Sequence, residues 1–120
     1  MKTKPTLLLV DDDPAIRSLI ALSLRNHGYN VVEAADGEDA MERARDLSSI
    51  TAVVSDICMP NLNGFALADA VREIHPTVRF VFMSGYPVDK NRLKSNSQFL
   101  CKPFHPSSLL SALATASQAA

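Results

Sequence analysis

The chain has 120 residues, enough for one domain, and 47% of them are hydrophobic and 21% charged, a balance that excludes a disordered protein. With 12 basic and 13 acidic residues the formal net charge is −1, which gives no electrostatic attraction to nucleic acids or anionic membranes. No apolar stretch near the start is long enough for a signal peptide or a membrane span, and the two cysteines are too few for a disulfide-stapled fold. We therefore expect a cytoplasmic protein with free thiols.

Apolar runs and turn residues predict strands and helices in alternation. The first run, Thr6–Val10, is apolar throughout, which is typical of a strand buried on both sides of a parallel sheet. Four more strands are predicted at residues 30–34, 51–55, 79–83 and 98–101. Helices are expected to begin at Asp13-Pro14, Asp36-Gly37, Phe65, Pro87 and Pro106, the one after Pro87 being short and polar and reaching about Lys94.

Apolar residues recur at helical spacing within these helices. The clearest series are Ile16, Leu19, Ile20 and Leu24; Ala40, Met41, Ala44 and Leu47; Phe65, Ala68, Val71 and Ile74; and Leu109, Leu110 and Leu113. Gly28 and Pro76 end the first and third helices. Five such strand–helix units, joined by right-handed crossovers, predict an open, doubly wound α/β sheet with helices on both faces.

Polar residues follow four of the five predicted strands. They are Asp11-Asp12, Asp56, Ser84 and Lys102. Each alone has an ordinary explanation, because acids at strand ends are usually helix caps and a lone serine or lysine is usually a turn or surface residue. The set is informative because the carboxyl ends of parallel strands meet at one edge of the sheet, where open α/β proteins bind their ligands.

The chemistry of this set favours phosphoryl transfer. Three clustered carboxylates repel one another, and Mg²⁺ with its preference for oxygen ligands relieves that repulsion. Lys102 adds a cation and Ser84 a hydroxyl donor, which are the groups that stabilise a phosphoryl group. Asp56 can then act as a carboxylate nucleophile. A flavin mononucleotide site is disfavoured, because the loop after the first strand is acidic and would repel a preformed phosphate.

Four motifs resemble the receiver domains of bacterial two-component response regulators. They are LVDDDP at 9–14, SDICMPNLNG at 55–64, MSG at 83–85 and KPF at 102–104. The match runs from Thr6 to about Ala116, which implies a single receiver domain over 1–120 with a core at about 6–116 and no output domain. It also implies a flavodoxin-like fold of five parallel strands in the order 2-1-3-4-5, and a cis peptide bond between Lys102 and Pro103.

The resemblance implies a phosphoacceptor site. Asp56 is expected to accept a phosphoryl group from a phosphohistidine on a histidine kinase or a histidine phosphotransfer protein. Mg²⁺ is expected to bind Asp12, Asp56 and the backbone carbonyl of Cys58, with Asp11 acting mostly through a metal-bound water. Lys102 is expected to pair with the phosphoryl group.

The resemblance also implies a switch. The Ser84 hydroxyl would move toward the phosphoryl group, and Phe99, at the position of the switch aromatic, would turn into the space that Ser84 leaves. A protein-binding surface would change as a result, for a downstream partner that the sequence does not identify. We expect a monomer or weak dimer that binds neither nucleic acid nor membrane and is not an enzyme.

Several positions depart from the family pattern. Asn63 replaces an aspartate before Gly64, with little expected effect. Cys58 and Tyr86 stand where neighbouring side chains control water access to the phosphoryl group, so self-dephosphorylation could be slow or both residues could serve only in packing. The connection from Ser84 to Lys102 is short, which predicts a reduced or irregular fourth helix. A Cys58–Cys101 disulfide is not expected, because one strand would separate the two residues.

Other functions stay open at this point. A metal-dependent phosphohydrolase of the haloacid dehalogenase kind would also use Asp56 as nucleophile, but it needs a second aspartate where Cys58 stands. A pseudo-receiver that only binds partners would have no need of the complete set of polar residues. The MSGYP run at 83–87 resembles receivers attached to hybrid histidine kinases, so the chain could also be part of such a kinase.

Overall fold

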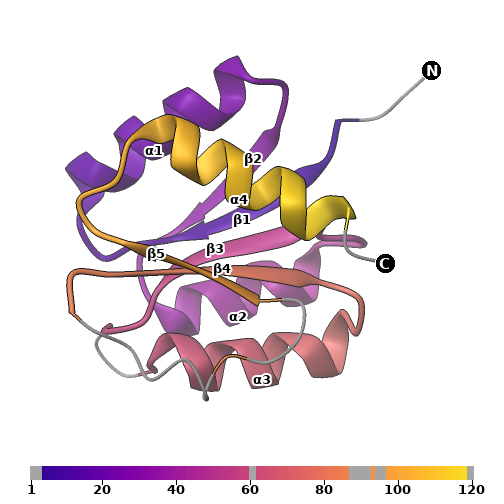
Figure 1. Cartoon of the computed structure of the whole chain (residues 1–120). Helices are drawn as coiled ribbons and strands as arrows, with labels where there is room; N and C mark the ends of the chain where they lie inside the picture. The colour runs from indigo at the N-terminus through magenta and orange to yellow at the C-terminus, as the bar shows by residue number, and fades with distance from the viewer. Residues whose placement is uncertain (1–3, 60–61, 87–92, 94–96, 119–120) are drawn as a thin grey trace.

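The computed structural model describes residues 4–59, 62–86, 93 and 97–118 (Figure 1). Five parallel strands form one sheet in the order β2-β1-β3-β4-β5, which confirms the predicted topology. The strands are β1 (Thr6–Val10), β2 (Asn30–Ala34), β3 (Ala52–Asp56), β4 (Arg79–Ser84) and β5 (Ser97–Cys101). The short helix predicted after Pro87 lies outside the described residues, apart from Leu93.

Four helices lie within the described residues, two on each face of the sheet (Figure 1). They are α1 (Pro14–Asn26), α2 (Gly37–Asp46), α3 (Gly64–Ile74) and α4 (Pro106–Gln118). Helices α1 and α4 cover one face, and α2 and α3 cover the other. This arrangement is the doubly wound fold that the order of elements predicts.

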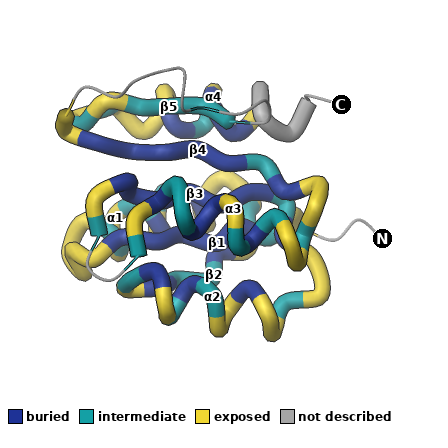
Figure 2. Tube along the Cα trace, turned by 90° about the horizontal axis from the view of Figure 1, so that it is seen from below, coloured by how far each residue is buried: buried dark blue, intermediate teal, exposed yellow. Residues whose placement is uncertain are grey.

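The sheet separates two apolar cores because its side chains alternate between the faces. Leu8 and Val10 pack against α2 and α3, whereas Leu7 and Leu9 pack against α1 and α4. All four are fully buried, which explains why the first strand is apolar throughout. Figure 2 shows the inner strands β1, β3 and β4 buried and the outer sides of the helices exposed, whereas the edge strand β5 is half-buried.

Local capping chemistry sets where the helices begin. The side chain of Asp13 accepts hydrogen bonds from the backbone N–H groups of Ala15 and Ile16, with Pro14 as the first helical residue. Asp36 caps α2 in the same way through the backbone N–H of Asp39. Both caps confirm the predicted helix starts. Past the end of α1, Gly28 adopts φ +93°, a conformation that only glycine takes without strain.

Two of the predicted helical faces need correction. Ile16 and Leu19 belong to the regular apolar series of α1, yet they are 40% and 69% exposed. Leu24 and Ile20 of the same series do pack on the core, together with Ala21, and this orientation of the helix turns Ile16 and Leu19 away from the sheet. Ile74, the last residue of α3, is 38% exposed because the helix ends there.

No helix in the described part of the chain combines the length and apolar character that crossing a bilayer requires.

Candidate functional site

Three carboxylates meet at the carboxyl edge of the sheet, as the strand ends predict. Asp11 and Asp12 follow β1, and Asp56 ends β3, the neighbouring strand. One carboxylate oxygen from each residue lies within 4.8 Å of the others. Asp11 and Asp56 are buried, at 1% and 6% exposure, whereas Asp12 is exposed to solvent. The cluster is therefore buried at Asp11 and Asp56 and open to solvent at Asp12.

Asp11 is held with one oxygen engaged and the other available. Its Oδ1 accepts a hydrogen bond of 2.9 Å from the backbone N–H of Asp13. Its Oδ2 is buried and has no hydrogen-bond partner among the described residues, although the Lys102 Nζ lies 3.5 Å away. A buried carboxylate oxygen without a donor is costly, so this atom is available for a ligand.

Lys102 brings the fixed positive charge into the cluster. Its Nζ lies 2.5 Å from Oδ1 of Asp56. Its backbone N–H donates a hydrogen bond of 2.8 Å to the carbonyl of Ser84, which ties the end of β5 to the end of β4. The peptide bond between Lys102 and Pro103 is cis, as the family resemblance predicts. The lysine therefore follows the same sheet edge as the acids.

The environment of Asp56 opposes its ionisation. Burial raises the pKa of Asp56, and the adjacent Asp11 carboxyl raises it further, while Lys102 lowers it by less. The pKa of Asp56 is consequently about 7, well above the ordinary 3.8. Burial lowers the pKa of Lys102, but the nearby carboxylates of Asp56 and Asp11 together outweigh this effect and raise that pKa overall. The single ammonium group of Lys102 therefore does not offset the burial of Asp56 and the adjacent Asp11 carboxyl.

Ser84 and Phe99 lie on the two strands beyond β3. Ser84 is 6% exposed, and its Oγ accepts a hydrogen bond of 3.0 Å from the backbone N–H of Tyr86. Phe99 is half-buried and pairs in register with Phe82 of β4. The side chain of Tyr86 is 71% exposed, and Cys58 and Cys101 are free and exposed. The predicted influence of Cys58 and Tyr86 on dephosphorylation stays a prediction.

The backbone at Gly64 packs closely against the backbone of Asp56. The sequence indicates only a turn at this position. The N–H of Gly64 donates a hydrogen bond of 2.8 Å to the carbonyl of Ile57. A Cβ at Gly64 would lie 2.5 Å from the carbonyl oxygen of Asp56 and 2.9 Å from the Ile57 Cα. Asn63 accepts a hydrogen bond from the Ala66 N–H and so caps α3, and the small effect expected of this asparagine stays a prediction.

An apolar cleft of about 460 Å³ adjoins the site, and sequence reasoning does not find it. Its lining consists of Ile16, Leu19, Ile20, Lys102, Pro103 and Phe104. The signal is present in the apolar series of α1, but its spacing alone indicates a core-facing stripe. Lys102 belongs both to this cleft and to the acidic cluster, so the two features are continuous.

The donor set of the acidic cluster fits Mg²⁺. This ion takes oxygen ligands, usually one or two carboxylates together with waters and phosphate oxygens. Asp11, Asp12 and Asp56 supply carboxylates at the required closeness, and the buried Oδ2 of Asp11 lacks a hydrogen-bond donor among the described residues. A divalent cation would also favour the ionised form of Asp56, whose pKa is raised by burial and by the adjacent Asp11 carboxyl.

Comparison with known proteins defines the class of this fold and site. A crystal structure of the receiver domain from the hybrid histidine kinase CckA superimposes with a TM-score of 0.84 and 34% sequence identity, over 94% of this chain and 99% of that one. The fold is thus the flavodoxin-like fold of solved receiver domains. The family model of the response regulator receiver domain matches residues 7–114. The chain belongs to the response regulator receiver domain family of two-component systems.

Curated relatives include both large and small proteins. The sensor kinase CckA of Brucella abortus is 39% identical over 104 residues, which are 82% of this chain but only 11% of that kinase. The response regulator receiver protein CpdR of the same organism is 29% identical over 103 residues, 82% of this chain and 85% of CpdR. The chain therefore spans about a tenth of the first relative and most of the second.

Proposed function

We propose that this chain is a phosphoacceptor in a two-component phosphorelay and that Asp56 receives the phosphoryl group in a Mg²⁺-dependent reaction. The observation that carries this proposal is the contact between Lys102 and Asp56 inside a cluster of three carboxylates. A lysine and a metal-binding cluster around one carboxylate are what an acyl phosphate requires, because its oxygens need cations on more than one side.

The donor is the phosphohistidine of a histidine kinase or a histidine phosphotransfer protein. An oxygen of the Asp56 carboxylate attacks the phosphorus, the new O–P bond forms, and the P–N bond to the histidine breaks. The electron pair of the broken bond returns to the imidazole nitrogen. The products are an aspartyl phosphate on this chain and a free histidine on the donor, so the reaction needs no other reactant.

The polar residues of the site would have separate roles in binding Mg²⁺ and the phosphoryl group. Asp12, Asp56 and the backbone carbonyl of Cys58 would hold Mg²⁺, with Asp11 acting mostly through a water molecule. When bound, Mg²⁺ supplies positive charge for the phosphoryl oxygens. Lys102 would exchange its contact with Asp56 for a contact with the phosphoryl group.

Phosphorylation would then change the positions of two side chains, Ser84 on β4 and Phe99 on β5. The Oγ of Ser84 would leave the N–H of Tyr86, from which it now accepts a hydrogen bond, and donate to the phosphoryl group. Phe99, half-buried on β5, would turn inward behind it. The change would alter the surface offered to a downstream protein, which makes the chain a relay in the cytoplasm, monomeric or weakly dimeric, and not an enzyme.

The apolar cleft beside Lys102 supports a protein as the donor. Leu19 and Ile16 are exposed at its wall, and exposed apolar surface next to a reactive group is typical of a docking surface. A donor protein that buries this cleft would bring its phosphohistidine to the open side of the acidic cluster. The same geometry is compatible with a stand-alone regulator and with the receiver of a hybrid kinase.

The test is incubation with Mg²⁺ and acetyl phosphate, followed by intact mass spectrometry. We expect one added phosphoryl group, lost on treatment with hydroxylamine, and no addition without Mg²⁺ or in Asp56→Asn. The matched control is Asp46→Asn, which removes an exposed carboxylate from the end of α2 and should be phosphorylated like the wild type. Absence of any adduct in the wild type would refute the proposal, and turnover of many equivalents of a phosphate ester would favour a phosphohydrolase.

A further inference from the structure

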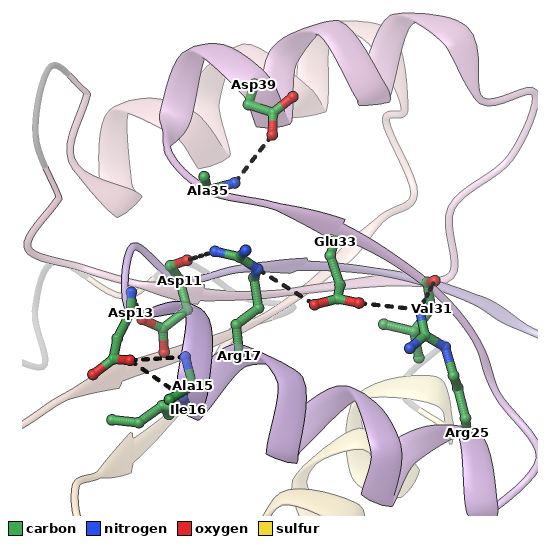
Figure 3. A network of polar contacts seen from close by, with 10 residues as sticks. All are labelled: Asp11, Asp13, Ala15, Ile16, Arg17, Arg25, Val31, Glu33, Ala35 and Asp39. Carbon is green, nitrogen blue, oxygen red and sulfur yellow. Dashed lines mark hydrogen bonds and ion pairs between the residues drawn. The ribbon is translucent and has the colours of Figure 1, made fainter.

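A network of charged side chains contacts the acidic cluster through the backbone of Asp11 (Figure 3). Arg17 on α1 donates a hydrogen bond of 2.7 Å from Nη1 to the carbonyl oxygen of Asp11. Its Nε donates a second one, of 3.3 Å, to Oε1 of Glu33 on β2. The Arg17 side chain is only 18% exposed, so these bonds are partly shielded from water.

Glu33 is itself fixed by a second arginine. Arg25, further along α1, donates from Nη2 to Oε2 of Glu33 at 3.3 Å and to the carbonyl of Val31 at 2.9 Å. One carboxylate on β2 therefore lies between two guanidinium groups on α1 (Figure 3). Because both of its oxygens are engaged, Glu33 orients Arg17 toward the carbonyl of Asp11.

The contact with this carbonyl matters because of where the carbonyl lies in the chain. The carbonyl oxygen of Asp11 belongs to the peptide unit that joins Asp11 to Asp12, and a peptide unit is planar. The preceding peptide unit is held as well, because the backbone N–H of Asp11 donates to the carbonyl of Ala34 at 3.2 Å. Fixing both groups sets the direction in which the Asp11 and Asp12 side chains leave the backbone.

We propose that Arg17, oriented by Glu33, is a positioning residue that fixes the Asp11–Asp12 peptide and thereby the geometry in which these two carboxylates bind Mg²⁺. The inference rests on the proposed function, in which this cluster is the metal site for phosphorylation of Asp56. Arg17 touches neither the metal nor the phosphoryl group. Its effect passes through one hydrogen bond to the main chain, in the manner of residues that support metal ligands from outside.

Charge alone would have the opposite effect, which makes the inference testable. A guanidinium near a cation site repels the cation, so removing the charge of Arg17 should strengthen Mg²⁺ binding if electrostatics were its whole role. Removing a positioning bond should weaken Mg²⁺ binding. The two explanations therefore predict changes of opposite sign for the same substitution.

The experiment is calorimetric titration of the full chain with Mg²⁺ for the wild type, Arg17→Met and Arg17→Lys. We expect the dissociation constant of Arg17→Met to rise about tenfold. Arg17→Lys keeps the charge but has a single nitrogen and cannot reach both Asp11 and Glu33 as the fork does, so it should also bind Mg²⁺ more weakly. The rate of phosphorylation by acetyl phosphate at subsaturating Mg²⁺ should fall in parallel, and saturating Mg²⁺ should restore most of it.

Arg43→Met is the matched control. Arg43 also pairs with a carboxylate at 3.3 Å, that of Asp39 on the same helix, but it is 52% exposed. Its substitution should leave the dissociation constant unchanged. Circular dichroism establishes that each variant is folded, and if Arg17→Met is not, the comparison of Arg17→Lys with the wild type decides.

The inference is overturned if folded Arg17→Met binds Mg²⁺ as tightly as the wild type or more tightly, or if Arg17→Lys is indistinguishable from it. A wild type that binds no Mg²⁺ would overturn it as well. A wild type that binds Mg²⁺ but takes no phosphoryl group refutes the proposed function instead, and the comparison of dissociation constants still decides the role of Arg17.

Discussion

Lys102, which follows β5, contacts Asp56 at the end of β3 across the intervening strand β4. Asp56 ends β3, Lys102 follows β5, and β4 lies between them, yet Nζ and Oδ1 are 2.5 Å apart. The lysine also lies 3.5 Å from Oδ2 of Asp11, so a single ammonium group faces two buried carboxylates. The balance of these charges determines how the site responds to substitution and to pH.

Removal of the lysine charge should destabilise the metal-free protein. Lys102→Met leaves the carboxylates of Asp11 and Asp56 to repel each other without compensation, so we expect the free energy of unfolding at pH 8 to fall by about 2 kcal/mol. Urea unfolding monitored by circular dichroism measures it. Lys4→Met removes an exposed lysine near the start of β1 and should change little. A Lys102→Met protein as stable as the wild type would contradict this account of the site.

Replacement of the acid should have the opposite effect, with a defined pH dependence. The folded-state pKa of Asp56, about 7, lies above the ordinary 3.8, so the folded protein holds the proton more tightly than the unfolded chain does. Stability should therefore decrease as pH rises from about 4 through 7 in the absence of Mg²⁺. Asp56→Asn should remove this decrease and stabilise the metal-free protein at pH 8 by about 1–3 kcal/mol.

Thermal unfolding of wild type and Asp56→Asn at a series of pH values, with a chelator present, tests this expectation. The two curves should converge toward pH 4, diverge between about pH 4 and 7, and remain apart by a constant difference above pH 7. Parallel curves across the whole range would mean that the buried carboxyl is not held protonated by the fold. Added Mg²⁺ should narrow the difference at pH 8, because the cation offsets the repulsion among the carboxylates.

Substitution of Gly64 should disturb the site without touching a polar side chain. A Cβ at this position would lie 2.5 Å from the Asp56 carbonyl oxygen, so Gly64→Ala must displace the backbone that carries Asp56. We expect a loss of about 2 kcal/mol in unfolding free energy and slower phosphorylation. Gly85→Ala is the control, because a Cβ added at Gly85 would meet no described atom within 4 Å. Equal stability losses in the two variants would argue against the close approach.

The cleft beside Lys102 should matter only when the donor is a protein. Leu19→Asp places a charge at the wall of the cleft, so transfer from a phosphohistidine protein that phosphorylates the wild type should slow about tenfold. Phosphorylation by acetyl phosphate should not change. Leu22→Asp is the matched control on the same helix, since Leu22 is 57% exposed but lies outside the cleft. Equal slowing by both variants would remove the cleft from the proposed docking surface.

Sequence periodicity predicted the sheet because its strands are strongly patterned. A run such as Thr6–Val10, buried on both faces, has few alternatives to a central parallel strand, and Asp13-Pro14 is an unambiguous helix start. The acids, Ser84 and Lys102 could be assigned to one edge because parallel strands bring their carboxyl ends together. Local chemistry and topology therefore sufficed for the composition of the candidate site.

Features that depend on packing between distant segments could not be predicted. The exposure of Ile16 and Leu19 depends on which side of α1 faces the sheet, and the apolar spacing alone allows a rotation that exposes them. The bond from Arg17 to the Asp11 carbonyl needs Glu33 from another strand to orient it. The close approach at Gly64 is equally invisible in a linear pattern, because its partner is a backbone atom of another segment.

The most direct test of the account is the position of the phosphoryl group on the chain. The wild type is phosphorylated with acetyl phosphate and Mg²⁺, reduced with borohydride to convert a phosphorylated aspartate to homoserine, digested, and read by peptide mass spectrometry. The account predicts homoserine at position 56 alone, absent when Mg²⁺ is chelated. Modification at Asp11 or Asp12 with Asp56 intact, or no modification at all, would contradict it.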